Sequence, residues 1–207
     1  MPTPFAFAAP LALALSSAGA PADQSGVSAT VAMASPAIVL SAAAPLPTDP
    51  ITPQEAFTSL EGAWSGALTY RDYSSQKLQS IPVALTMETQ PDGETMVQRF
   101  DYTDPGFQVY ITNLVTVKGG MLSGATARAG RSFETYEKTV AVTRQAMFDQ
   151  WTIVLEDEAS DDDRPARIRE TMTRAQGTLK VLKEVDYLDD AKEEWIFRNE
   201  ITLIAED

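Results

Sequence analysis

Hydrophobic and polar residues alternate along most of the chain after residue 62. The first run is Trp64-x-Gly66-x-Leu68-x-Tyr70, whose intervening residues are small or polar. A period of two is typical of antiparallel strands that bury one face. Comparable runs occupy residues 81–87, 96–102, 151–155, 168–172, 179–181 and 195–203. A further run at 107–117 is apolar on both faces, which predicts deeper burial.

Turn signals separate these runs at regular intervals, and together they predict about nine or ten strands with no second helical pattern. The turn sequences are Pro91-Asp92-Gly93, Asp104-Pro105-Gly106, Gly119-Gly120, Ala129-Gly130, Gln176-Gly177 and Asp189-Asp190. Residues 156–163 are strongly acidic. Because charge runs are usually solvated, we expect them to form a hairpin loop between two strands, without a metal site.

One short helix precedes the first strand, at residues 52–61. Thr52 is suited to cap it, Pro53 fits the first helical position, and Glu55 completes a capping box. A single helix followed by many short antiparallel strands predicts a mainly β fold. We expect an antiparallel up-and-down β-barrel of about eight to ten strands, since closure removes the edge strands that promote aggregation.

The first fifty residues differ sharply from the rest. They hold two charged residues, Asp23 and Asp49, and eight of the chain's 13 prolines. The apolar stretch at 5–20, followed by Ala20-Pro21-Ala22, is typical of a secretory signal and its cleavage site, although Lys and Arg are absent before it.

This pattern predicts three segments. Residues 1–22 are expected to be a signal peptide, 23–50 an Ala/Pro-rich disordered linker, and 51–207 the barrel domain. We therefore expect an exported protein, periplasmic or extracellular, with no membrane span in its mature form. A membrane anchor within 27–47, and a wrongly assigned start codon, are the alternatives.

Composition excludes several classes of chemistry. The chain has no Cys and no His, which rules out disulfides, thiolate nucleophiles, zinc fingers and His-based triads. The formal net charge of −13 disfavours binding to nucleic acid or to anionic membranes. No nucleotide-binding or hydrolase motif is present, so we expect no cofactor and no catalytic residue.

Strand alternation also predicts which side chains face the barrel interior. If Trp64 points inward, every second residue of its strand also points inward, and the same holds for the apolar positions of the other runs. The residues selected in this way carry aromatic, thioether and charged groups. Such residues suit a small apolar or semi-polar ligand, although they also fill the core of any barrel. Glu170 and Arg174 share one face, so they could form an inward pair that orients a polar head group. The predicted ligand-cavity residues are Leu68, Tyr70, Met87, Phe100, Tyr102, Trp151, Glu170, Met172, Arg174 and Phe197.

The helix followed by Gly62-x-Trp64 resembles the opening of the lipocalin-like (calycin) barrels. In that family the Trp closes one end of the barrel and a basic residue of the last strand packs across it. Arg198 occupies the matching position near the C-terminus. The resemblance implies a latch in which the Arg198 guanidinium contacts the Trp64 indole. The chain also resembles secreted bacterial lipocalin-like proteins of unassigned function, and the haem barrels of similar opening need a His that it lacks.

Three functions follow as hypotheses. The first is a secreted or periplasmic barrel that binds a small ligand without catalysis. The second is a protein-interaction or inhibitor-type barrel of the cell envelope, which a filled interior and an exposed apolar patch would favour. The third is a carboxylate-based enzyme on the same barrel, which a perturbed carboxylate in the cavity would favour.

Overall fold

The computed structural model describes residues 50–72, 77–104, 106–147 and 149–206. The predicted signal peptide and nearly all of the predicted linker lie outside these residues. Within them the chain forms one helix and ten strands, which confirms the predicted fold class. The elements are α1 (Pro53–Thr58), β1 (Gly62–Arg71), β2 (Leu78–Thr89), β3 (Thr95–Asp104), β4 (Phe107–Lys118), β5 (Met121–Arg128), β6 (Glu134–Met147), β7 (Gln150–Asp161), β8 (Arg164–Ala175), β9 (Thr178–Tyr187) and β10 (Ile196–Ala205).

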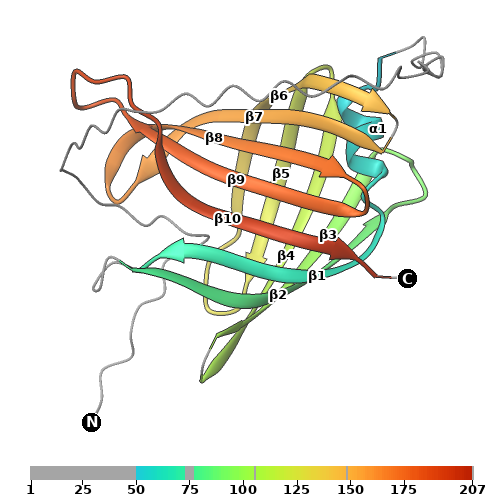
Figure 1. The fold of residues 1–207 in the computed structure, drawn as a ribbon, viewed down its shortest axis with the longest axis horizontal. Helices are drawn as coiled ribbons and strands as arrows, with labels where there is room; N and C mark the ends of the chain where they lie inside the picture. The colour runs from blue at the N-terminus through green and yellow to red at the C-terminus, as the bar shows by residue number, and fades with distance from the viewer. Residues whose placement is uncertain (1–49, 73–76, 105, 148, 207) are drawn as a thin grey trace, which may run out of the picture.

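All ten strands are antiparallel, and each pairs with its neighbour in sequence. The barrel closes where β1 pairs with β10, with Trp64 opposite Ala205 and Leu68 opposite Ile201. Figure 1 shows these two strands side by side, although they lie at opposite ends of the described chain. None of the helices in the described ranges is long and apolar enough to cross a membrane.

The helix begins as the sequence predicts. Thr52 caps it: its Oγ1 accepts a hydrogen bond from the Glu55 backbone N–H at 3.2 Å, and the Glu55 carboxylate accepts one from the Thr52 backbone N–H at 2.8 Å. Two backbone N–H groups that have no partner within the helix are thereby hydrogen-bonded, each to the side chain of the other residue. Ala56 and Phe57 are buried and turn the helix toward the barrel interior.

The acidic run at 156–163 is not the predicted hairpin loop. β7 continues to Asp161 and β8 begins at Arg164, so only Asp162 and Asp163 form the turn, both with positive φ. Asp157 and Asp161 follow the inward-facing Leu155 by two and six residues, so they share its parity, and both line the cavity of the barrel. The prediction was wrong because it expected the whole charge run to be solvated, whereas two of its carboxylates face the interior from within β7.

Candidate ligand-binding cavity

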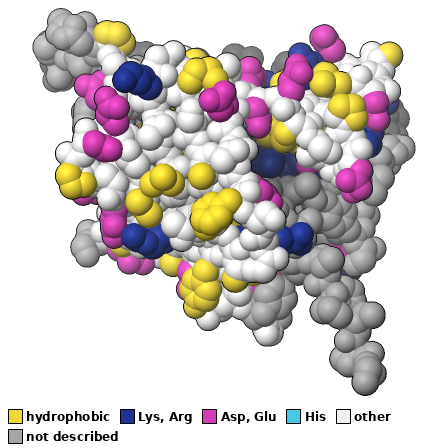
Figure 2. Space-filling model, turned by 180° about the vertical axis from the view of Figure 1, so that it is seen from behind, with side chains coloured by type: hydrophobic (Ala, Val, Ile, Leu, Met, Phe, Trp, Pro, Cys, Tyr) yellow, Lys and Arg dark blue, Asp and Glu magenta, His cyan; other side chains and the backbone are white. Residues whose placement is uncertain are grey.

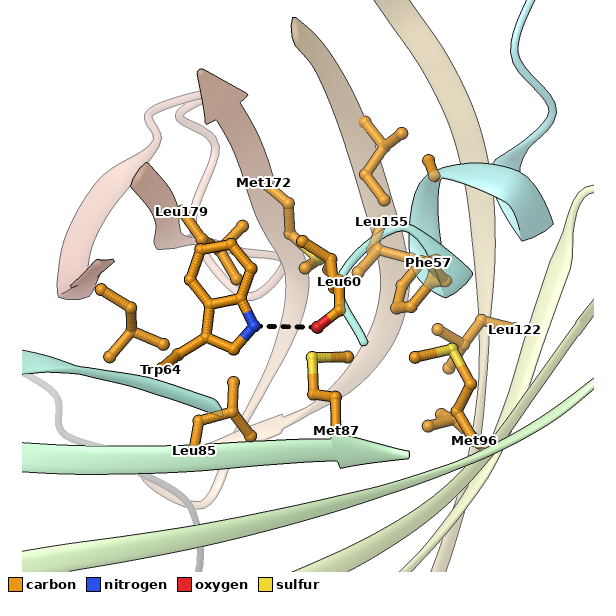
Figure 3. Packing of buried hydrophobic residues seen from close by; sticks show 14 of the residues in the cluster. Phe57, Leu60, Trp64, Leu85, Met87, Met96, Leu122, Leu155, Met172 and Leu179 are labelled. Carbon is orange, nitrogen blue, oxygen red and sulfur yellow. Dashed lines mark hydrogen bonds between the residues drawn. The ribbon is translucent and has the colours of Figure 1, made fainter. Parts of the chain in front are cut away.

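One end of the barrel is plugged by α1 and two indoles. Trp64 is buried and its Nε1–H donates to the Leu60 carbonyl at 2.8 Å (Figure 3). Trp151 is also buried, and its Nε1–H donates to Ser59 Oγ at 3.3 Å. Arg174 donates to the Ser59 carbonyl. Hydrogen bonds from side chains of β1, β7 and β8 therefore fix residues 59 and 60, which follow the helix, to the barrel.

Above this plug the barrel encloses a cavity of about 460 Å³. That volume is within the range typical of small-ligand sites. Its floor is apolar, with Phe57, Met87 and Leu122 among the lining residues. Its other end is polar and is lined by residues at the opposite ends of the strands, among them Asp104, Arg128, Glu134 and Ser160. The interior is therefore hollow and changes from apolar to polar along its length.

Four charged side chains line one side of the cavity. They come from four consecutive strands: Lys138 of β6, Asp157 of β7, Glu170 of β8 and Lys183 of β9. Lys138 Nζ lies 3.0 Å from Glu170 Oε2 and 3.9 Å from Asp157 Oδ1. Lys183 is directly opposite Glu170 in the register of β8 and β9. We call these four residues the interior charge cluster.

The environment shifts the pKa of each member of the cluster. Burial alone would raise the pKa of Glu170, but the attraction of Lys138 and Lys183 outweighs it and holds that pKa below its usual value. Asp157 has a raised pKa because burial and the Glu170 charge both disfavour its ionised form more than Lys138 favours it. Burial disfavours both ammonium groups, yet the two carboxylates raise the pKa of Lys138, whereas the pKa of Lys183 stays lowered.

Uncharged polar groups line another part of the wall. Asn113 of β4 donates to Gln98 Oε1 of β3 at 3.3 Å, and Thr126 of β5 donates to Asn113 Oδ1 at 2.8 Å. Burial and the Glu170 charge raise the pKa of Tyr102 on β3, so its phenol stays protonated and able to donate. The cavity thus offers amide, hydroxyl, carboxylate and ammonium groups to a ligand.

The predicted contact between Trp64 and Arg198 is wrong. Trp64 lies opposite Ala205, at the plugged end, whereas Arg198 is near the beginning of β10, at the other end. Arg198 is buried with Asp161, with which it forms an ion pair, and its Nη2 donates to Tyr187 Oη at 2.8 Å. The guanidinium of Arg174, in contrast, lies 5.8 Å from the centre of the Trp64 ring.

Six of the ten predicted cavity residues line the cavity, and the other four lie elsewhere in the fold. Arg174 and Trp151 belong to the plug, and Tyr70 packs partly buried against the core. Phe197 does not face the cavity, because a β-bulge between it and Asn199 shifts the register and places it opposite Glu184, on the outer face. The predicted residues that line the cavity are Leu68, Met87, Phe100, Tyr102, Glu170 and Met172.

The predicted pairing of Glu170 with Arg174 is therefore replaced by one between Glu170 and Lys138. The alternation of the sequence did not identify Lys138, Asp157 and Lys183 as inward residues. Two of them could have been identified, because Asp157 and Lys183 each follow an inward-facing apolar residue, Leu155 or Val181, by two positions and therefore face the same side of the strand.

Comparisons with known proteins identify no function. No family model matches the chain, and no curated protein matches it. Among solved structures, it was matched to a protein of unknown function of the DUF3598 family from Nostoc punctiforme. The two are 8% identical, with a TM-score of 0.24 over 75% of this chain and 100% of that one.

Proposed function

We propose that this protein is an exported, lipocalin-like barrel that binds one small molecule with an apolar body and a polar head. A single observation carries the proposal: a hollow interior of about 460 Å³ that is apolar at its floor and holds the interior charge cluster along one side. Placing four ionisable groups inside a barrel is costly, and a filled apolar core would be at least as stable. A ligand that uses these groups accounts for their position.

The proposal predicts that filling the cavity removes binding. Val181 of β9 lines the cavity, so Val181→Trp places an indole where the ligand body would lie. We expect the affinity for the fluorescent probe 1-anilinonaphthalene-8-sulfonate to fall at least about tenfold, or ~1.4 kcal/mol. Fluorescence titration of the probe is the measurement.

The matched control is Val154→Trp. Val154 lies between the buried Ile153 and Leu155, so its side chain is on the outer face of β7 and should leave probe affinity unchanged. Equal affinities of both variants and the wild type would place the probe outside the barrel and contradict the proposed site.

Export is part of the same proposal, and it rests on the composition of the first fifty residues. We expect the mature protein to begin after Ala22, the end of the small-residue cleavage pattern. N-terminal sequencing of protein recovered from the periplasm or medium measures this directly. A mature start at or before residue 10 would contradict export by this signal.

A protein-interaction barrel is the second candidate. Hydrophobic side chains gather on one face of the molecule (Figure 2). Among the described residues, Tyr110 and Leu114 of β4 are 59% and 49% exposed, and their spacing places them on the same face of the strand. A barrel that acts through this outer surface would retain its activity in Val181→Trp, which distinguishes the two functions.

A further inference from the structure

Lys183 differs from its neighbour Lys138 in what surrounds its amine. Lys138 is held by two carboxylates, at 3.0 and 3.9 Å. Across the described ranges, no carboxylate lies within ion-pair distance of Lys183 Nζ, although Glu170 faces it across the register. The flanking inward positions, Val181 and Val185, are apolar. Lys183 thus lies in the cavity wall without the ion pair that would fix its charge.

This setting favours a neutral amine. Burial disfavours the Lys183 ammonium and Lys138 repels it, and together they outweigh the attraction of Glu170 and Asp157, so the pKa of Lys183 is lowered. A neutral lysine amine is a nucleophile, and desolvation in an apolar pocket is a general way to activate it. Lys183 is therefore chemically distinct from an exposed residue such as Lys180, which pairs with Glu200 at 2.8 Å.

The groups beside Lys183 can also move protons. Glu170 is ionised and lies opposite Lys183 in the register of β8 and β9, and Lys138 donates to Glu170 from 3.0 Å. A carboxylate that accepts a proton and an ammonium that donates one are what the addition of an amine to a carbonyl group and the loss of water require.

We propose that Lys183 captures an aldehyde with an apolar body as a reversible imine inside the barrel. The inference rests on the proposed function, since the cavity must first admit the molecule. It deepens that function by naming the polar head as a carbonyl group and the bond as covalent.

The steps balance without any further reactant. The amine nitrogen bonds to the carbonyl carbon, and Glu170 takes a proton from the nitrogen and returns it to the carbonyl oxygen. The nitrogen lone pair then expels this oxygen as hydroxide, which takes a proton from the Lys138 ammonium and leaves as water. The protonated imine finally returns its proton to Lys138 through Glu170. The net reaction is aldehyde plus amine to imine plus water.

The test is to trap the imine. Wild-type protein is incubated near neutral pH with cinnamaldehyde and sodium cyanoborohydride, which reduces an imine to a stable amine, and the labelled lysines are mapped by mass spectrometry of peptides. We expect Lys183 to carry several-fold more label than Lys180, because the lowered pKa leaves more of its amine neutral and the cavity holds the aldehyde beside it. Lys183→Arg should remove that label, and Lys180→Arg should not affect it.

Non-covalent binding separates the two proposals. Cinnamyl alcohol has the same body but forms no imine, and calorimetry measures its binding to the wild type and to Val181→Trp. If the alcohol binds only the wild type while Lys183 labels no faster than Lys180, the imine inference is overturned and the binding function stands. If the alcohol does not bind and Lys183 is not preferentially labelled, both proposals fail. The comparison of Lys183 with Lys180 within the wild type needs no variant to fold.

Discussion

Replacing Arg198 by leucine will destabilise the fold by about 3–5 kcal/mol, because it leaves a buried carboxylate without its cation. The side chains of Arg198 and Asp161 are 3% and 1% exposed. The Tyr187 hydroxyl links them, since it accepts from Arg198 at 2.8 Å and donates to Asp161 Oδ2 at 3.0 Å. Removal of the guanidinium breaks its ion pair with Asp161 and its hydrogen bond to Tyr187, and leaves the hydrogen bond between Tyr187 and Asp161. Urea denaturation followed by tryptophan fluorescence measures the loss.

Two further variants show that the effect belongs to the buried pair. Arg99 and Glu88 form an exposed ion pair at 2.9 Å, with side chains 50% and 52% exposed, so Arg99→Leu should cost no more than about 1 kcal/mol. The double variant Arg198→Leu with Asp161→Leu removes both charges and should recover much of the lost stability. A loss in Arg198→Leu no larger than that in Arg99→Leu would show that the pair is not effectively buried.

Replacing Trp64 by alanine will cost about 3–5 kcal/mol, the usual effect of removing a large buried aromatic side chain. The indole packs among Leu60, Leu85 and Leu179, and its N–H holds the Leu60 carbonyl (Figure 3). The variant therefore loses apolar packing and also releases the segment that joins α1 to β1. Denaturation measures the first loss, and faster hydrogen exchange of the α1 amides reports the second.

Trp195 provides the matched control on the outside of the barrel. The Arg169 guanidinium lies 4.0 Å from the centre of its ring, a contact worth about 0.5–1 kcal/mol at exposed sites. Trp195→Ala should therefore cost far less than Trp64→Ala and leave α1 exchange unchanged. Similar losses in the two variants would refute the role of Trp64 in the plug.

The strand pattern was predictable because alternation is a local property. A strand with one buried face repeats every two residues wherever it lies, so Leu68, Met87 and Met172 were assigned inward from sequence alone. The capping box of α1 was predictable for the same reason, since both partners lie within four residues of each other.

What depends on the closed barrel was not predictable. The partner of Trp64 depends on the register of β1 with β10, which the sequence of neither strand reveals. The orientation of Phe197 depends on one extra residue in β10, which reverses parity before Asn199. Glu170 was predicted to face inward, but the other members of the interior charge cluster were not, because hydrophobic patterning treats an inward charge as the end of a strand, whereas here Asp157 and Lys183 lie within strands.

The seam between β1 and β10 also governs when the fold can form. Every other pairing joins strands that are consecutive in the chain, but this one joins Trp64 to Ala205. Closing so long a loop is slow, and until it happens β1 and β10 present unpaired edges that invite association with other chains. The barrel cannot be completed until β10 has been synthesised. Under the proposed export, a chain with this order of strands would stay incomplete during its passage and fold after it.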